Sequence, residues 1–258
     1  YTGDGKRLTD MWQYGGRALL GYTPPQLLRV FKNTAERGLF VPLPHPAEDR
    51  LYRALSVLLP RRRFRLFPND AALREALAAA NFPAGVFDPA VDMGKKAPKT
   101  VPTLWRPWLM DPAVLDSPTP ETASLLIPVL PLPFPGAPAV LALDPALEAP
   151  FPPAPPLSPV ILAAAAQSVH RLLAAPGRPS FAGLDRVLTG NSSWKRTGIY
   201  LNYNPPGTRG MPDYQTVFSR FLEGGFLLPP LREEPVILPG ELSAGEEVKL
   251  AALVSATV

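Results

Sequence analysis

The residues best placed for chemistry follow a short apolar strand in the first third of the chain. Phe64–Phe67 is strand-like, and after a proline either Asn69 or Asp70 can cap a helix over Ala71–Ala80. A strand that feeds a helix through a polar turn is where α/β proteins commonly hold a phosphate, because the free N–H groups of the helix attract an anion. Here the turn has no glycine, and the carboxylate of Asp70 would repel a phosphate. A capping role of about 1 kcal/mol is sufficient to explain Asp70.

Lysines are the second group that could do chemistry, because only an amine can form a Schiff base with an aldehyde. The sequence holds no lysine between Lys99 and Lys195. Lys95, Lys96 and Lys99 lie in a loop-like stretch, whereas a catalytic lysine is usually desolvated. We therefore interpret these three as solvated loop residues, and a lysine that forms a Schiff base is the alternative.

Arginines and histidines supply the remaining candidates for binding. Arg17, Arg106 and Arg196 could each bind a carboxylate through two parallel hydrogen bonds, although pairing on the surface is the default expectation for each. His45 lies between two prolines and could touch a ligand, but a structural role is commoner for such a histidine. His170 lies on an apolar helix and is expected to pack. The sequence contains two histidines and no cysteine, so it predicts no transition-metal site.

Composition excludes several classes of protein. The 258 residues carry a net charge of +4, but the basic residues cluster only at Arg61–Arg63 and Lys95-Lys96, so we expect no nucleic-acid partner. No apolar run approaches the roughly 20 residues that cross a bilayer, so we expect no membrane span. The absence of cysteine excludes disulfides and fits a reducing compartment, and we expect a cytoplasmic protein.

Proline is strongly enriched, with 36 residues that crowd between Pro102 and Pro159. Proline at this density excludes interior strands and long helices, and Pro150–Pro156 is expected to be an extended connector. Elsewhere, and in the gaps between the prolines, periodicity and capping residues predict an α/β chain. The expected helices are Gln26–Arg37, Ala47–Leu59, Leu157–Ala175, Tyr214–Leu222 and one that Ser243 caps. The expected strands are Arg7–Met11, Val86–Asp88, Leu125–Val129, Ala139–Leu143, Lys195–Tyr203, Phe226–Leu228 and Val236–Leu238.

Two long stretches have an order of residues that goes beyond composition. The front has Asp4-Gly5, Leu8, Asp10 and then Leu20-Gly21-Tyr22 with Pro25, and the back has Phe221 to Pro230 around Gly224-Gly225. With these patterns, residues 3–59 and 212–253 resemble class III aminotransferases, the pyridoxal-phosphate (PLP) enzymes of fold type I, and most closely glutamate-semialdehyde aminomutase. The resemblance implies an α/β fold with a reduced PLP-transferase fold type I large domain and an α+β small domain built from both chain ends.

The resemblance also implies an organisation and a partner. Residues 1–59 would form an N-terminal segment that belongs to the small domain and to an interface. Residues 60–190 would form a shortened large domain with the proline-rich connector, and residues 191–258 the C-terminal small domain. The first strand is therefore expected to pack against Lys195–Val254. Because active sites of the family lie at subunit interfaces, the expected assembly is a homodimer.

Several positions match or replace the binding residues of the family. Asn69 and Asp70 stand where the family has a Ser-Gly-Thr turn that holds the cofactor phosphate. Asp88 follows a strand and could stand for the aspartate that pairs with the pyridine nitrogen. Tyr14-Gly15-Gly16 replaces a Ser-Trp-Gly near the substrate pocket. The predicted substrate-binding residues are Tyr14, Gly15, Gly16, Arg17 and His45.

The cofactor determinants of the family are missing together. The lysine expected shortly before the helix that begins at Ser158 is absent, Pro89 follows Asp88 where the family prefers glutamate, and the glycine-rich run is absent. We therefore predict an aminotransferase-like binding or regulatory homologue that holds no cofactor and takes a small amino or keto acid. The alternatives are an active PLP-dependent aminotransferase or aminomutase with a relocated lysine, and an assembly partner of a full-length homologue.

Overall fold

A computed structural model describes most of the chain. The described residues are 3, 5, 7–23, 26–38, 45–83, 85–93, 95, 98, 100–109, 123–147, 151, 155–175, 180–205 and 213–257. Lys96, Lys99 and most of the Pro150–Pro156 connector lie outside them, so the predictions made for these residues stay predictions.

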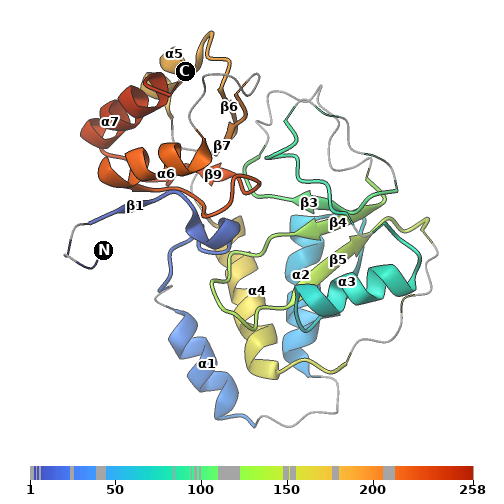
Figure 1. Ribbon diagram of the computed structural model, residues 1–258. Coiled ribbons are helices and arrows are strands. Elements are labelled where there is room, and N and C mark those ends of the chain that lie inside the picture. The colour runs from blue at the N-terminus through green and yellow to red at the C-terminus, as the bar shows by residue number, and fades with distance from the viewer. Residues whose placement is uncertain are drawn as a thin grey trace.

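A four-stranded sheet occupies the middle of the chain (Figure 1). Its strands are β2 (Arg63–Phe67), β3 (Thr103–Trp105), β4 (Leu125–Pro128) and β5 (Ala139–Leu143), in the order β2-β5-β4-β3. β5 runs antiparallel to both neighbours, whereas β3 and β4 are parallel. The predicted strands in the regions of β2, β4 and β5 are confirmed. β3 is an additional strand, whose short apolar pattern is hidden between Pro102 and Pro107.

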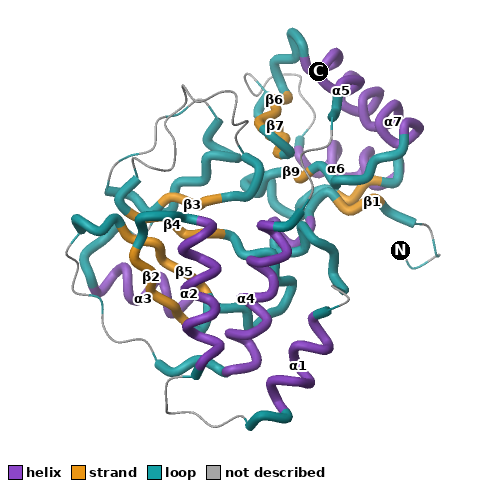
Figure 2. Tube along the Cα trace, turned by 180° about the vertical axis from the view of Figure 1, so that it is seen from behind, coloured by secondary structure: helices purple, strands orange, loops and turns teal. Residues whose placement is uncertain are grey.

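Helices cover both faces of this sheet, as Figure 2 shows from behind. α2 (Pro46–Leu58) and α4 (Pro159–Leu173) cover one face and α3 (Asp70–Ala79) the other, and α1 (Leu27–Ala35) packs on the outside of α4. Successive side chains of a strand point to opposite faces. Leu66 accordingly packs into a core with α2 and α4, and Phe67 packs into a second core with α3. α4 also contacts α1, so the alanine-rich helix lies between α1 and the sheet, as its apolar composition predicts.

The two ends of the chain meet in a second body of structure. It contains β1 (Thr9–Asp10), α5 (Ala182–Leu188), β6 (Trp194–Thr197), β7 (Tyr200–Tyr203), α6 (Tyr214–Glu223), β8 (Phe226–Leu227), β9 (Val236–Ile237) and α7 (Ala244–Ser255). β1 runs parallel to β8, with Thr9 opposite Phe226. This pairing joins residues 217 positions apart and confirms that the first strand packs against the C-terminal segment.

The segment Lys195–Tyr203 forms a hairpin rather than the single strand that its alternation predicts. β6 and β7 are antiparallel, with Thr197 opposite Tyr200. Gly198 adopts φ +60°, a left-handed conformation that glycine reaches without steric cost. The reversal places both strands in one sheet of order β6-β7-β9. The pattern of alternating side chains is the same in a strand and in a tight hairpin, so alternation alone did not distinguish them.

The final helix begins with the capping box that the sequence predicts. The Ser243 hydroxyl accepts a hydrogen bond from Glu246 N at 3.2 Å, and Glu246 Oε2 accepts one from Ser243 N at 2.9 Å. Thr9 Oγ1 also donates to Glu246, which ties β1 to this helix. The hydrogen bonds from the backbone and side chain of Ser243, together with that from Thr9, lower the pKa of Glu246 from 4.5 to about 2.

Stability should therefore fall in acid as Glu246 is protonated. A lowered folded-state pKa stabilises the protein above pH 4.5, and the contribution is lost as the pH falls towards 2. Water weakens the effect near the surface. Urea unfolding at several pH values should show a shallower acid decline for Glu246→Gln than for the control Glu241→Gln, which removes one exposed carboxylate elsewhere. Equal declines in the two variants would contradict this assignment.

Candidate functional site

The carboxyl edge of the parallel strands is the natural place for a site in this fold. β3 and β4 are parallel, and Phe87 forms a bridge to Thr103 in the same direction. Asp88 follows Phe87 and Arg106 follows β3, so both residues come to this edge of the sheet. In open α/β sheets ligands bind outside the carboxyl ends of the strands. We call this region the strand-edge site and define it by Gly15, Gly16, Asp88, Arg106 and Tyr200.

A buried ion pair occupies the centre of the strand-edge site. Arg106 Nε lies 2.9 Å from Asp88 Oδ1, and Arg106 Nη2 lies 2.7 Å from Asp88 Oδ2. The side chains are only 6% and 15% exposed. Burial by itself would lower the pKa of Arg106, but the hydrogen bonds and the negative charge of Asp88 outweigh it and raise the pKa. The guanidinium is therefore a permanent cation inside the protein.

The same guanidinium holds the N-terminal segment against the sheet. Arg106 Nη1 donates to the carbonyl oxygen of Gly15 at 2.8 Å. Gly15 and Gly16 lie in a short 3-10 turn at positive φ, and a Cβ on Gly16 would stand 3.3 Å from Arg106 Nη1. Glycine is therefore needed at position 16, because a larger residue would press on the buried arginine.

Tyr200 closes the site from the second sheet. Its ring lies 5.7 Å from the Arg106 guanidinium carbon, and its hydroxyl donates to the carbonyl oxygen of Pro107 at 2.8 Å. Burial raises the pKa of Tyr200 well above its usual value, so the phenol stays neutral. A neutral ring face beside a cation is a favourable contact.

The turn between β2 and α3, which the sequence predicts to resemble a phosphate-binding turn, is occupied by an ion pair. Asn69 is the cap of α3 and accepts a hydrogen bond from Ala72 N at 2.9 Å. Asp70 is the first helical residue rather than the cap, and its Oδ2 lies 2.6 Å from Arg17 Nη2. Arg17 thus joins the N-terminal segment to the start of α3. The structure brings these predicted cofactor and substrate residues together, but as partners of each other.

His45 has a structural role in the described part of the chain. Its Nδ1 accepts a hydrogen bond from Ala47 N at 3.1 Å, which caps α2. Tyr14, the remaining predicted substrate residue, stands at φ +50° in the 3-10 turn, with its ring at right angles to that of Trp12. That His45 and Tyr14 contact a ligand stays a prediction.

Two features of the site could not be predicted from the sequence. Arg106 was expected on the surface, but it is 7% exposed and its bidentate partner is the protein's own Asp88. Glu234 accepts a hydrogen bond from Trp12 Nε1 at 3.3 Å, beside Gly15. The polar sequence before β9 does not indicate that the Glu234 carboxylate would contact the turn near Trp12. The bidentate geometry of an arginine was foreseeable, but its partner was not.

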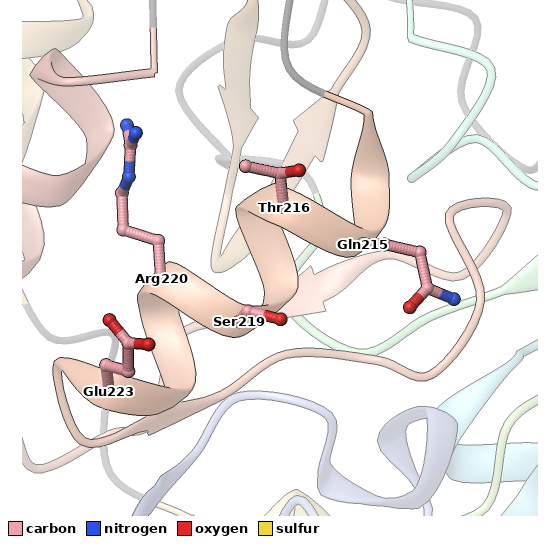
Figure 3. Close-up of a pocket in the computed structure, with 5 residues that line it drawn as sticks. All are labelled: Gln215, Thr216, Ser219, Arg220 and Glu223. Carbon is pink, nitrogen blue, oxygen red and sulfur yellow. The ribbon is translucent and has the colours of Figure 1, made fainter.

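The described residues also contain two surface hollows away from the strand-edge site. One, of about 380 Å³, runs along the outer face of α6 and is drawn in Figure 3. Gln215, Thr216, Ser219, Arg220 and Glu223 line it, and Arg220 Nη1 donates to the carbonyl oxygen of Ala256. The other, of about 470 Å³, lies beside β6. Among the described residues no cluster of three metal-ligating side chains occurs, and none of the described helices is both long and apolar enough to span a bilayer.

Comparison with known proteins identifies a relative of the chain. It is 30% identical to an uncharacterized protein of Treponema pallidum (strain Nichols), over 93% of this chain and 85% of that protein. No family model matches the chain.

The solved structures that share this fold include several aminotransferases. An omega-transaminase from Sphaerobacter thermophilus superposes with a TM-score of 0.64 at 13% identity, covering 99% of this chain and 87% of that one. An acetylornithine aminotransferase from Elizabethkingia anophelis gives 0.62 at 10% identity, over 99% and 90%. An ornithine aminotransferase from Plasmodium yoelii gives 0.61 at 9%, over 100% and 90%. The chain therefore belongs to the same family as the uncharacterized Treponema pallidum protein, and its α/β fold is that of the PLP-dependent aminotransferases.

Proposed function

We propose that this chain is a class III aminotransferase-like protein that has lost Schiff-base catalysis and acts as a binding or regulatory homologue. The Arg106–Asp88 ion pair is the observation that carries the proposal. The fold implies pyridoxal phosphate as a cofactor, and neither the residues of the strand-edge site, nor those at the start of α3, nor the described lysines fit it. The reasons concern the pyridine end, the phosphate end and the aldehyde in turn.

At the pyridine end, a carboxylate must present a free oxygen to a protonated ring nitrogen. Both oxygens of Asp88 accept hydrogen bonds from Arg106, and Oδ1 also accepts one from Ala90 N. A guanidinium in this position carries the positive charge that a pyridinium would bring, so the two would repel each other. Asp88 is therefore committed to an internal partner.

At the phosphate end, the donors and the charge are also taken. The side chain of Asn69 uses the N–H of Ala72, which a phosphate at this helix end would need. The Asp70 carboxylate adds negative charge in the first turn of α3, and Arg17 is paired with it. A phosphate would have to displace a carboxylate from its arginine and stand beside it.

For the aldehyde, the described lysines offer no desolvated amine beside the site. Lys95 Nζ pairs with Asp92 at 2.8 Å and its side chain is 73% exposed. Lys195 is an exposed residue of β6. A Schiff base with the cofactor needs a desolvated amine, and neither of these exposed lysines supplies one.

Borohydride trapping with pyridoxal phosphate tests the proposal. Purified protein should show no saturable absorbance of an aldimine, and reduction should leave label spread thinly over exposed lysines, because no amine is held beside the cofactor position. Peptide mapping by mass spectrometry measures the distribution, and an active aminotransferase is the positive control. One lysine labelled to one equivalent per chain would overturn the proposal and favour the active enzyme.

The proposal includes a small amino or keto acid as ligand, a cytoplasmic location and a homodimer. The aminotransferase fold supports the dimer, and light scattering should give twice the chain mass of 27.9 kDa. A monomer at micromolar concentration would remove the dimer from the proposal and leave the loss of Schiff-base chemistry untouched.

A further inference from the structure

The segment between β1 and α1 lies over the strand-edge site. We call its residues 12–22 the N-terminal strap, which in Figure 1 belongs to the blue segment that follows β1. A Cβ on Gly16 of the strap would stand 3.5 Å from Ile237 Cδ1 and 3.6 Å from Val129 Cγ1. The strap therefore touches both β9 and the residue that follows β4. With the strap in this position the side chain of Arg106 is only 6% exposed.

The turn inside the N-terminal strap has a strained backbone. Residues 13–16 adopt φ of +47°, +50°, +64° and +98° in succession, and the first two, Gln13 and Tyr14, are not glycine. At positive φ a Cβ comes close to the following carbonyl oxygen, so neighbouring residues with side chains rarely share this conformation. The other described non-glycine residues at positive φ occur singly. Strain of this kind persists only where the surroundings hold it, and it gathers at functional sites.

Hydrogen bonds hold the strap closed against this strain. Asp10 Oδ1 accepts from Trp12 N and Gln13 N, both at 2.9 Å, and the Tyr22 hydroxyl donates to Asp10 Oδ2 at 2.6 Å. The structure describes all of residues 12–22, and among their apolar side chains Ala18 alone is buried. Because a hydrogen bond can be exchanged for one with water and little apolar surface is at stake, opening the strap costs less than unfolding a core.

Glu234 adds a second cost to the closed state. Its Oε1 accepts a hydrogen bond from Trp12 Nε1, which is long at 3.3 Å. Its Oε2 is buried and has no partner among the described residues. A buried carboxylate oxygen without a donor is unfavourable. Water reaches this oxygen once Trp12 has moved away, so opening the strap relieves the cost.

We propose that the N-terminal strap opens and closes over the strand-edge site and thereby controls access to Arg106. In the open state the carbonyl oxygen of Gly15 leaves Arg106 Nη1, whereas Asp88 keeps its hydrogen bonds to Nε and Nη2. The uncovered Nη1 is then a charged donor for a carboxylate. The inference deepens the proposed function, and it rests on that function in taking the strand-edge site as the place where a small amino or keto acid binds.

Labelling with phenylglyoxal, a reagent selective for arginine, measures how often Arg106 is uncovered. The reagent reacts slowly compared with loop motion, so the rate, followed by peptide mapping in a mass spectrometer, reports the open fraction. Tyr14→Gly and Tyr14→Ala both remove the ring that packs on Trp12, but only glycine also removes the Cβ at φ +50°. Arg106 should be labelled about tenfold more slowly in Tyr14→Gly than in Tyr14→Ala. At an ordinary position glycine would instead loosen the backbone, so the sign of the difference identifies the strain.

Two controls separate opening of the strap from other routes to Arg106. Arg196, which pairs with Asp185 outside the strap, should be labelled at one rate in all variants. Leu162→Val weakens the core beneath α4 and should leave the labelling of Arg106 unchanged, while thermal unfolding confirms that each variant is folded. The proposal is wrong if Arg106 is never labelled, if Tyr14→Gly is labelled as fast as Tyr14→Ala or faster, or if Leu162→Val speeds the labelling of Arg106.

The labelling experiment uses no cofactor, so its result is independent of the test of Schiff-base chemistry. A strap that fails the labelling test leaves the trapping result unchanged. A lysine trapped by borohydride would overturn the proposed function and leave the measured opening of the strap as it is.

Discussion

Replacing Arg106 by methionine should lower the free energy of unfolding by about 3–5 kcal/mol, because it leaves the Asp88 carboxylate buried without its partner. The carbonyl oxygen of Gly15 loses its donor as well. Methionine fills a similar volume, so the loss reports the missing charge and hydrogen bonds more than a cavity. Denaturant unfolding followed by circular dichroism measures it, provided the slope of the transition stays the same.

Arg17→Met is the comparison, since it breaks an arginine–aspartate pair of similar length nearer the surface. Asp70 is 52% exposed there, and exposed pairs contribute about 0–1 kcal/mol. The double variant Arg106→Met with Asp88→Asn removes both charges and keeps an acceptor for Ala90 N. It should be more stable than Arg106→Met alone. If Arg106→Met costs no more than Arg17→Met, the buried pair does not stabilise the strand-edge site.

Much of the fold follows from local signals in the sequence. Ser243 with Glu246, and the strand that ends before Asn69, are patterns of a few neighbouring residues whose physics is complete within one turn. They were predicted and are found. The pairing of β1 with β8 is not local, and it was foreseeable because the resemblance covers both chain ends.

The interior of the candidate site could not be predicted in the same way. A sequence shows that Arg106 can bind a carboxylate, but many aspartates and glutamates compete for it. Arg106 pairs with Asp88 because Phe87 forms a parallel bridge to Thr103 of β3. This bridge brings Asp88 and Arg106, which are 18 positions apart, to one edge of the sheet. This contact depends on the order of the strands in the sheet. The prolines on both sides of β3 made that strand hard to predict from the sequence.

Among the glycines that the structure describes, Gly198, in the turn between β6 and β7, should tolerate substitution least. A Cβ at Gly198 would stand 2.0 Å from the carbonyl oxygen of Trp108 and 2.6 Å from that of Leu109. Both are backbone atoms, so no side-chain rotation can relieve the overlap. Gly198→Ala should therefore cost about 4 kcal/mol or more, in the range of the most damaging single substitutions. Thermal and urea unfolding measure the loss.

Gly190→Ala separates overlap from backbone strain. Gly190 adopts φ +81° as Gly198 adopts φ +60°, but nothing lies within 4 Å of a Cβ built on it. Its substitution should cost only the left-handed backbone term, about 1–2 kcal/mol. The difference in unfolding free energy between the two variants then measures the cost of separating the hairpin from Pro107–Leu109. Tyr200 also contacts this segment through its hydroxyl. Because this segment follows Arg106, Gly198→Ala should also weaken the strand-edge site, and Tyr200→Phe in the Gly198→Ala background should then cost less than in the natural sequence. Equal losses for Gly198→Ala and Gly190→Ala would mean that the hairpin does not pack tightly against the end of β3.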